Sequence, residues 1–300
     1  MKTLYLIDAS IYVFRAWFSM DEGMTDKQGN PVNAVYGFAY FLAQLLEKTQ
    51  PTHVVALFDE SLSSSFRNKI YPQYKANREP APPELKYQFQ LCRQLCRALG
   101  IKEMASKRYE ADDLVGSLSV RFADKNTRMI IVSRDKDLVQ LLREGDLFWD
   151  FADDRQLDHK QAEAHFGVRP DQIVDFLALA GDSADNIPGV RGIGKKTARA
   201  LLNHFQTLDQ LYASLDQVAE MKIRAAARTH DLLKQQKEQA YLSRQLTQIK
   251  CDVKLQLQTQ DLQWLPDIRK TGRFFNSLGF GQGLLSRFER LMEDSRHAVG

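Results

Sequence analysis

The chain has 300 residues, with a hydrophobic fraction of 44% and a charged fraction of 26%, values ordinary for a protein that folds in water around a sizeable core. The apolar run near its start is short and is interrupted by Asp8, which excludes an ordinary signal peptide. No apolar stretch approaches the roughly 20 residues that cross a bilayer. We therefore expect a cytoplasmic protein without a membrane partner. A monomer is the default, because no self-pairing surface stands out.

The three cysteines exclude two further classes of protein. An odd and sparse set does not make a disulfide framework, and no Cys or His pair completes a zinc site. Cys92 and Cys96 lie four apart in a predicted helix, so we expect buried thiols there, with Cys251 as the third cysteine.

The net charge is only +3, but the charges are unevenly distributed. Lys and Arg outnumber Asp and Glu in residues 60–110 and 186–250, whereas acids predominate in residues 144–185. Two basic segments around an acidic centre suit a protein that binds a polyanion and gathers cations at one place. Solvated helix faces are the alternative explanation.

Short apolar runs at residues 4–7, 54–58 and 129–132 predict strands buried on both faces. Residues 101–104 and 147–151 are weaker strand candidates. Helical patterns lie between the strands, at about 34–48, 83–99 and 111–122. Strands that alternate with helices predict an α/β core built on a parallel sheet.

The pattern becomes helical after about Gly167. Pro170 begins a helix that leads to Leu179, and a glycine-rich stretch covers residues 181–194. Helices are predicted from Lys195 onward and through residues 210–246. The chain therefore reads as one α/β core followed by an all-helical extension.

Acidic residues follow each of the three best strands: Asp8, Asp59 and, after two further residues, Asp135. The carboxyl ends of parallel strands meet at one edge of a sheet, where ligands bind. A helix beginning at that edge, and two nearby loops, supply further acids. Acids in a first helical turn also suit the helix dipole, which is the alternative for that group. The remaining acids of this set are Glu110, Asp112, Asp113, Asp137, Asp182 and Asp185.

Nine clustered carboxylates repel one another unless cations neutralise them or their pKa values rise. Oxygen ligands without His or Cys favour Mg²⁺ or Mn²⁺ over zinc. Two such ions roughly 4 Å apart activate a water molecule and stabilise both oxygens of an in-line displacement. The acids therefore predict phosphodiester hydrolysis with two Mg²⁺ ions, for which Mn²⁺ can substitute.

Residues 66–78 interleave aromatic and basic side chains, as expected where bases stack and phosphates are contacted. We predict DNA contacts for Arg67, Tyr74, Lys75 and Arg78. If the segment is helical, Lys75 and Arg78 share a face and neutralise a scissile phosphate. An ordinary amphipathic surface helix is the alternative.

Residues 189–198 are similar to a helix-hairpin-helix. Gly192 and Gly194 allow a tight turn that exposes the N-terminus of the next helix, where Lys195 and Lys196 reinforce an anion site. Such a hairpin binds the duplex backbone without reading sequence. The spacing excludes a Walker P-loop, and the preceding helices disfavour a dinucleotide-binding loop. A structural turn is the alternative.

Taken together, these segments resemble the 5′→3′ exonuclease family, found at the N-terminus of bacterial DNA polymerase I and in the flap endonucleases. The resemblance runs in order from Asp8 to about Leu255. It rests on Asp59 with residues 66–78, Glu110 to Asp113, Asp135 to Asp137, and most of all residues 181–189. Tyr241 to Ser243 and Ile249 to Val253 also match.

The resemblance implies a PIN-like nuclease core at 1–169 with a helical arch at about 60–85. It further implies a helix-hairpin-helix region at 170–260 and a tail at 261–300 that packs on the core and frays over its last eight residues. Asp8, Asp59, Glu110 and Asp112 would serve the first metal, and Asp137, Asp182 and Asp185 the second. Asp113 and Asp135 lie between the two. Lys75 and Arg78 match cations that contact the scissile phosphate.

The resemblance also implies the substrate: DNA with a 5′ flap or a recessed 5′ end, cut to release 5′-phosphate fragments in replication or repair. RNA primers annealed to DNA remain compatible. A potassium ion is expected on hairpin backbone carbonyls, for which we name Val190 and Ile193. Because the chain ends at Gly300 without a polymerase domain, we expect a free-standing nuclease.

The sequence departs from the family pattern at Ala9, where glycine is common, and at Ser133-Arg134, where Thr-Gly or Ser-Gly is usual. Neither departure removes a carboxylate. Two rival functions stay open: a DNA-structure binder that cuts poorly, and a small PIN-type ribonuclease. The complete acid set argues against the first, and the hairpin and arch against the second.

Overall fold

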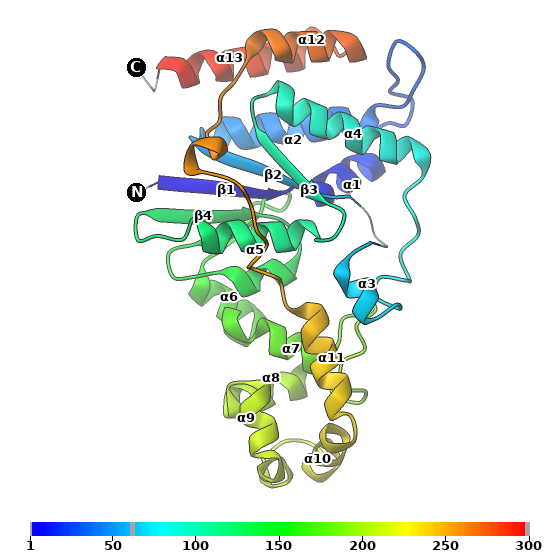
Figure 1. Ribbon diagram of the computed structural model, residues 1–300, viewed down its shortest axis with the longest axis vertical. Coiled ribbons are helices and arrows are strands. Elements are labelled where there is room, and N and C mark those ends of the chain that lie inside the picture. The colour runs from blue at the N-terminus through cyan, green and yellow to red at the C-terminus, as the bar shows by residue number, and fades with distance from the viewer. Residues whose placement is uncertain (1, 61–63, 298–300) are drawn as a thin grey trace.

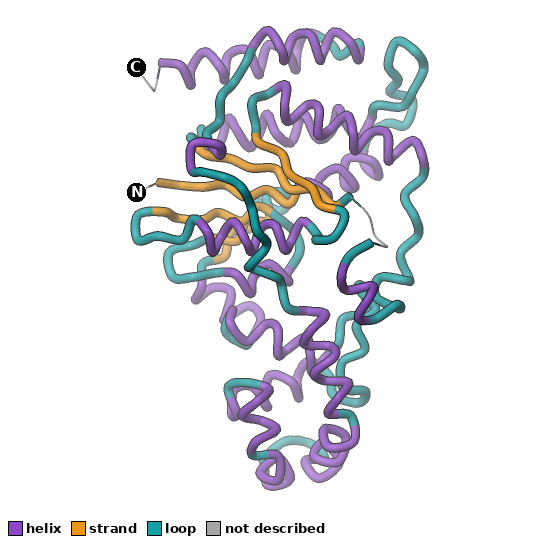
Figure 2. Tube along the Cα trace, in the orientation of Figure 1, coloured by secondary structure: helices purple, strands orange, loops and turns teal. Residues whose placement is uncertain are grey.

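The computed structural model describes residues 2–60 and 64–297 and is shown in Figure 1 and, coloured by secondary structure, in Figure 2. Six strands form one sheet in the order β3-β2-β1-β4-β5-β6. All neighbouring strands are parallel except β5 and β6. The strands are β1 Lys2–Asp8, β2 His53–Asp59, β3 Lys102–Ser106, β4 Thr127–Val132, β5 Leu147–Asp150 and β6 Arg155–Leu157.

Helices cover both faces of this sheet, as Figure 1 shows. In β1, Tyr5 and Ile7 pack in one hydrophobic cluster while Leu4 and Leu6 pack in another. This alternation follows from the two-residue period of a strand buried on both faces. The first face is covered by α1 Ala9–Ser19, α2 Asn33–Thr49 and α4 Pro83–Ala98, and the second by α5 Ala111–Arg121, α6 His159–Phe166 and α7 Ile173–Ala180.

The five predicted strands and the three predicted helices of the core are present, and the α/β fold class is confirmed. The prediction missed α1 and β6. Helix α1 follows Asp8 directly, without a turn residue to mark its start, and β6 is only three residues long.

The helical extension forms the narrow end of the molecule opposite α12 and α13 in Figure 1. It shares the second cluster with the sheet, so helix residues such as Leu201 and Leu233 belong to the same core as Leu4. Its elements are α8 Lys195–Phe205, α9 Leu208–Ala213, α10 Ala226–Gln235 and α11 Lys237–Thr247, with short 3₁₀ turns at Pro170–Gln172 and Leu215–Glu220.

The tail contains two helices, α12 Ile268–Leu278 and α13 Gln282–His297. They pack over α2 and α4 through buried side chains that include Phe275, Leu285 and Phe288. Helix α13 extends to His297, and the last three of the eight residues expected to fray lie outside the described residues. In the part of the chain that the structure describes, no helix is long and apolar enough to cross a membrane.

In its described part, the segment predicted as a helical arch has one short helix before α4, which is α3 Phe66–Ile70. Lys75 and Arg78 lie in the turns that follow, and Lys75 has a left-handed backbone with φ +53°. The two side chains are therefore not displayed on one helix face. Residues 61–63 of the predicted arch lie outside the described residues.

Candidate active site

The carboxyl ends of β1, β2 and β4 bring the predicted strand-end acids to one edge of the sheet. Asp8 and Asp59 are the last residues of β1 and β2, and Asp135 caps the 3₁₀ turn Lys136–Leu141 after β4. The hydroxyl of Ser133 donates to Asp8 at 2.8 Å and accepts from the backbone N–H of Asp135 at 2.9 Å. Ser133 thus joins two strand ends, a role that its position in the sequence did not reveal.

The first turn of α5 adds two further acids to this edge. Asp59 accepts from the backbone N–H of Ala111 at 2.8 Å, which docks the start of α5 against β2. Glu110 precedes the helix, and Asp112 lies close enough to Asp8 and Asp135 for their charges to affect its pKa. Helix α5 therefore delivers Glu110 and Asp112 to the strand ends.

The loop between α7 and α8 supplies Asp182 and Asp185. Backbone hydrogen bonds in both directions between Asp182 and Ile187, 2.9 and 2.7 Å, close this loop into a tight turn. Gly189 has φ +61°, and a Cβ there would lie 2.3 Å from the backbone nitrogen of Gly181. The glycine is thus required by close backbone contact, and the loop that carries both acids depends on it.

The acids at the strand ends have strongly perturbed pKa values. Burial raises the pKa of Asp8 to about 7, and the charges of Asp59 and Asp135 add to this effect. Burial, followed by Asp135, raises the pKa of Asp137 to about 8. The pKa values of Asp59, Asp112 and Asp135 are raised as well, with burial again the largest cause. These carboxylates are thus close enough to disfavour each other's ionisation.

This crowding predicts a pH-dependent stability of the metal-free protein. Folded Asp8 and Asp137 retain protons up to about pH 7 and 8, whereas the unfolded chain releases them near pH 4, so the unfolding free energy falls as pH rises. Between pH 7 and 8.5 we expect a loss of about 1–2 kcal/mol in EDTA.

Denaturant unfolding at a series of pH values measures this loss, with Asp137→Asn as the matched variant. In Asp137→Asn, most of the fall in unfolding free energy with rising pH should be absent. The other titrating groups are the same in both proteins, so the difference between them reports on Asp137. Equal slopes in the two proteins would contradict the crowding of these carboxylates.

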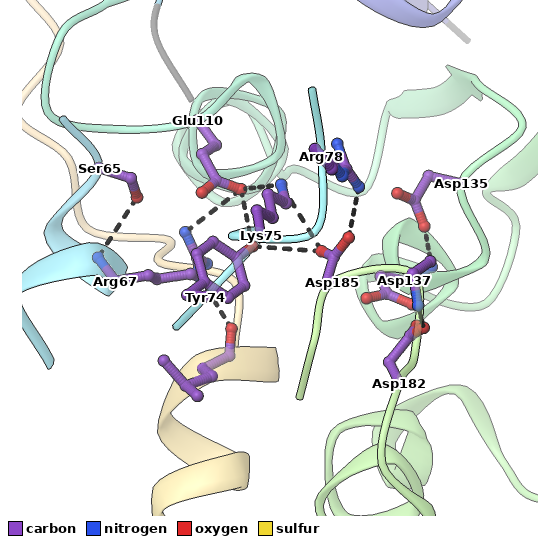
Figure 3. A network of polar contacts seen from close by, with 12 residues as sticks. Ser65, Arg67, Tyr74, Lys75, Arg78, Glu110, Asp135, Asp137, Asp182 and Asp185 are labelled. Atoms are coloured by element: carbon purple, nitrogen blue, oxygen red, sulfur yellow. Dashed lines mark hydrogen bonds and ion pairs between the residues drawn. The ribbon is translucent and has the colours of Figure 1, made fainter. Parts of the chain in front are cut away.

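Lys75 and Arg78 lie among these acids, as Figure 3 shows, and Lys136 lies beside Asp137 and Asp182. Lys75 Nζ lies 2.7 Å from Glu110 and 3.6 Å from Asp185, and Arg78 pairs with Asp185. Lys136 pairs with Asp182 and lies 3.3 Å from Asp137. Although burial opposes ionisation, Lys75 and Arg67 hold the pKa of Glu110 at about 2, and Lys136 likewise lowers the pKa of Asp182.

The acids therefore fall into two classes. Glu110, Asp137, Asp182 and Asp185 pair with protein cations, whereas Asp8, Asp59, Asp112 and Asp135 form no ion pair with any residue that the structure describes. Four crowded carboxylates that share only the more distant charge of Lys75 are a set that a divalent cation neutralises.

The donor chemistry of this edge fits Mg²⁺ or Mn²⁺. Every candidate ligand is a carboxylate, and Oδ1 of Asp137 is buried and accepts no hydrogen bond, although the Lys136 ammonium lies 3.3 Å from it. Among the described residues, however, no three His, Cys, Asp or Glu side chains converge closely enough to hold an ion as they stand. Backbone elements nevertheless bring the acids to one edge of the sheet. A cleft of about 200 Å³ opens here, lined by Ile11, Arg134, Asp135, Asp137 and Asp182, among others.

Three predicted site residues have other partners. Both oxygens of Asp113 accept from Arg67 at 2.8 Å, and Asp113 also accepts from the backbone of Glu110 and Lys250. Asp113 is fully buried, so it has no oxygen left for a metal, and we withdraw it as a ligand. Arg67 is only 2% exposed and also donates to the carbonyls of Leu246 and Gln248, so it is not available to DNA.

Tyr74 is likewise unavailable for base stacking, because it is only 4% exposed. Its hydroxyl lies 3.1 Å from Glu110 and 3.2 Å from Asp185, between the two acids. Its ring packs with Ile187 and Leu246. Tyr74 thus fixes the basic segment onto the site, a role that the aromatic-basic pattern did not distinguish from DNA binding.

Asn77 and Asn186 join the basic segment to the acidic loop, and the sequence analysis assigned neither of them a role. Asn77 Nδ2 donates to the carbonyl of Ser183 at 3.0 Å, and Asn186 Nδ2 donates to that of Gln73 at 2.6 Å. The backbone N–H of Lys75 donates to the carbonyl of Asp185 at 2.9 Å. These bonds hold Lys75 and Arg78 beside the acids.

The hairpin has the predicted form. Gly192 has φ +97°, Gly194 precedes α8, and Lys195 and Lys196 are exposed at the start of that helix. The carbonyl of Val190, predicted to bind potassium, accepts from the N–H of Ile193 at 2.9 Å. Charge from Lys195 also contributes to the lowered pKa of Asp182, so the hairpin lies near the acidic loop.

Comparison with known proteins agrees with this architecture. Residues 3–167 match the 5′-3′ exonuclease N-terminal resolvase-like domain, and residues 168–269 match the 5′-3′ exonuclease C-terminal SAM fold. The chain belongs to the 5′-3′ exonuclease family. It is accordingly a hydrolase of the 5′-3′ exonuclease class.

Two similar curated proteins are 5′-3′ exonucleases of comparable length. The one from Aquifex aeolicus is 35% identical over 90% of this chain and 90% of its own length. The one from Buchnera aphidicola of Schizaphis graminum is 32% identical over 87% of this chain and 91% of its own length. DNA polymerase I of Bacillus caldotenax is 36% identical over 96% of this chain, but the match spans only 32% of that polymerase.

Solved structures share the fold. A T5 5′-exonuclease with bound zinc superposes with a TM-score of 0.65 at 19% identity, covering 98% of this chain and all of that one. A bacteriophage T5 flap endonuclease variant in complex with DNA and metal ions gives a TM-score of 0.63 at 18% identity, covering 98% of this chain and all of that one. At these identities the likeness shows the fold alone.

Proposed function

We propose that the chain is a structure-specific 5′ nuclease that hydrolyses DNA at 5′ flaps and recessed 5′ ends, releasing fragments with a 5′-phosphate. The observation that carries this proposal is the edge where eight of the nine predicted acids gather beside Lys75, Arg78 and Lys136. Family membership and the hairpin support DNA as the substrate. Replication and repair are the processes that produce such 5′ ends.

The proposed metal sites divide the acids by the elements that carry them: mainly the ends of β1 and β2 with the start of α5 for one ion, and the turn after β4 with the loop between α7 and α8 for the other. Asp8, Asp59, Asp112 and Glu110 would hold one Mg²⁺, and Asp137, Asp182 and Asp185 the other, with Asp135 between them. Bound ions would supply an activated water and stabilise charge on the phosphate oxygens. Lys75 and Arg78 would contact the scissile phosphate from the segment that covers the acids, and their hydrogen-bonded backbone fixes their position.

The hairpin would bind the duplex beside the cut. Its exposed helix N-terminus and two lysines suit a phosphate, and potassium on the carbonyls of Val190 and Ile193 remains part of this proposal. We expect Lys195→Ala/Lys196→Ala to weaken flap binding for every sequence alike. The slope of log K against log salt should become shallower by about 2, because two phosphate contacts are lost. Measuring flap affinity by fluorescence anisotropy at a series of salt concentrations gives this slope. An unchanged slope would show that the duplex does not contact these two lysines.

Cleavage of flap DNA labelled at either end tests the function. With Mg²⁺ we expect cutting near the flap junction, a 5′-phosphate on the downstream product, and no cutting in EDTA. Single-stranded RNA in parallel reactions tests the PIN-type ribonuclease alternative. Tight binding of the flap without cutting in either Mg²⁺ or Mn²⁺ would instead establish a DNA-structure binder.

A further inference from the structure

Arg134 lies at the carboxylate edge, in the turn between β4 and Asp135, at a position where the sequence departs from the family pattern. The backbone N–H of Ser133 donates to the carbonyl of Trp149 at 3.1 Å, so the pairing of β4 with β5 continues one residue beyond the end of β4. This pairing brings Arg134 beside Asp150, the last residue of β5.

Two carboxylates of β5 and the turn after it hold the guanidinium of Arg134. Its Nη2 donates to Oδ2 of Asp153 at 3.1 Å, and its Nε lies 3.4 Å from Oδ2 of Asp150. Asp150 is itself fixed, because it is only 2% exposed and its Oδ1 accepts from the backbone N–H groups of Ala152 and Asp153. The direction of the arginine side chain is therefore set by this turn.

Arg134 nevertheless lines the cleft of about 200 Å³ at the carboxylate edge, together with Arg78, Asp135 and Asp137. Its side chain is 39% exposed. Within the described chain only its Nη2 makes a hydrogen bond, although a guanidinium carries donors on all of its nitrogens. Its two ion pairs there are with Asp150 and Asp153, and none is with the acids of the cleft. The remaining donors are therefore available to a ligand in the cleft.

A structural role accounts poorly for this arginine. Asp150 already has a second cation, Arg155 at 3.8 Å, besides the two backbone N–H groups that it accepts from. Asp153 is exposed, and an exposed ion pair contributes little to stability. The cleft, in contrast, is lined by several acids that repel a DNA phosphate unless cations offset their charge. A bound polyanion therefore explains a cation at this place better than the fold does.

We propose that Arg134 binds a backbone phosphate of the DNA strand at the cleft, at a different linkage from the one that Lys75 and Arg78 contact. Those two cations pair with acids at the start of α5 and in the loop between α7 and α8, whereas Arg134 is held by the turn after β5. The planar fork of a guanidinium suits two oxygens of one phosphate. This inference rests on the proposed function, because the strand must first lie at the acids.

Single-turnover cleavage of a 5′-flap duplex in Mg²⁺ over a range of enzyme concentrations tests this contact. It gives the half-saturating enzyme concentration and, separately, the rate at saturation. The variants are Arg134→Ala and, as the matched control, Arg155→Ala, because Arg155 is an exposed cation beside the same Asp150 but does not line the cleft. A second series of flap duplexes carries a single methylphosphonate linkage at successive positions around the junction, which removes the charge of one phosphate at a time.

We expect Arg134→Ala to raise the half-saturating concentration about tenfold, as loss of one charge-assisted contact does, and to leave the saturating rate within about twofold. Arg155→Ala should behave as wild type. One of the neutral linkages should raise the half-saturating concentration of the wild type by a similar factor and have no further effect in Arg134→Ala. The position of that linkage identifies the phosphate that Arg134 contacts.

An unchanged half-saturating concentration for Arg134→Ala, or an equal rise for Arg155→Ala, would overturn the inference. So would a full response of Arg134→Ala to every neutral linkage that affects the wild type, because the arginine would then act without contacting a phosphate. In each of these cases, normal cleavage by the wild type leaves the proposed function standing. If the wild type does not cleave the flap, the proposed function fails, and this inference fails with it.

Discussion

Lys75→Met should lower kcat for flap cleavage by about 10²–10³-fold, because a preorganised cation at a developing phosphate charge contributes this much. The ammonium lies 2.7 Å from Glu110 and 3.6 Å from Asp185, inside the acid group rather than at its rim. Methionine keeps most of the side-chain volume and removes the charge. Single-turnover cleavage with saturating enzyme measures the chemical step separately from DNA binding.

Lys69→Met is the matched control, since Lys69 is an exposed cation of α3 in the same segment. It should change DNA affinity modestly and leave the single-turnover rate within about twofold. An equal loss of rate in both variants would show that the segment acts through its overall charge. A normal rate for Lys75→Met would remove this lysine from the proposed mechanism.

Arg67→Met should destabilise the folded protein by about 3–5 kcal/mol, the usual cost of removing one partner of a buried ion pair. Arg67 makes two 2.8 Å bonds to Asp113 and further bonds to two carbonyls at the C-terminal end of α11, those of Leu246 and Gln248. Its loss leaves Asp113 fully buried without a counter-charge. Denaturant unfolding measures the change in the free energy of unfolding.

The double variant Arg67→Met/Asp113→Leu distinguishes this ion pair from simple packing. Because no buried charge is left unpaired, we expect it to be more stable than Arg67→Met alone. If the stability losses of the two single variants simply added up in the double variant, the assignment of Arg67 and Asp113 as a buried ion pair would be contradicted. Reduced metal affinity in a stable Asp113→Asn protein would restore Asp113 as a ligand.

Much of the fold could be predicted because its signals are local. The runs at residues 4–7, 54–58 and 129–132 are apolar on both faces, which is typical of strands in a parallel sheet covered by helices on both sides. Strand ends then place Asp8, Asp59 and Asp135 together by topology alone. In contrast, β6 has only three residues, and α1 begins without a capping hydrogen bond from Asp8.

The candidate site was less predictable where partners are distant in the sequence. Arg67 and Asp113 are 46 residues apart, and both matched the pattern for a functional role, yet they satisfy each other in the core. Tyr74, Asn77 and Asn186 show the same limitation, because their partners lie on a loop more than 100 residues away. Residue type and spacing reveal which groups are available, but only the packing shows which of them remain unpaired.

The most direct test of the carboxylate edge is single-turnover cleavage of a 5′-flap duplex in Mg²⁺ by the wild type and by Asp182→Asn/Asp185→Asn, with flap affinity measured for both. We predict that the double variant loses cleavage by at least about 10³-fold while it still binds the flap, because these acids serve the metals and the hairpin holds the duplex. Cleavage at the wild-type rate by the double variant would contradict the account and place the chemistry away from these acids.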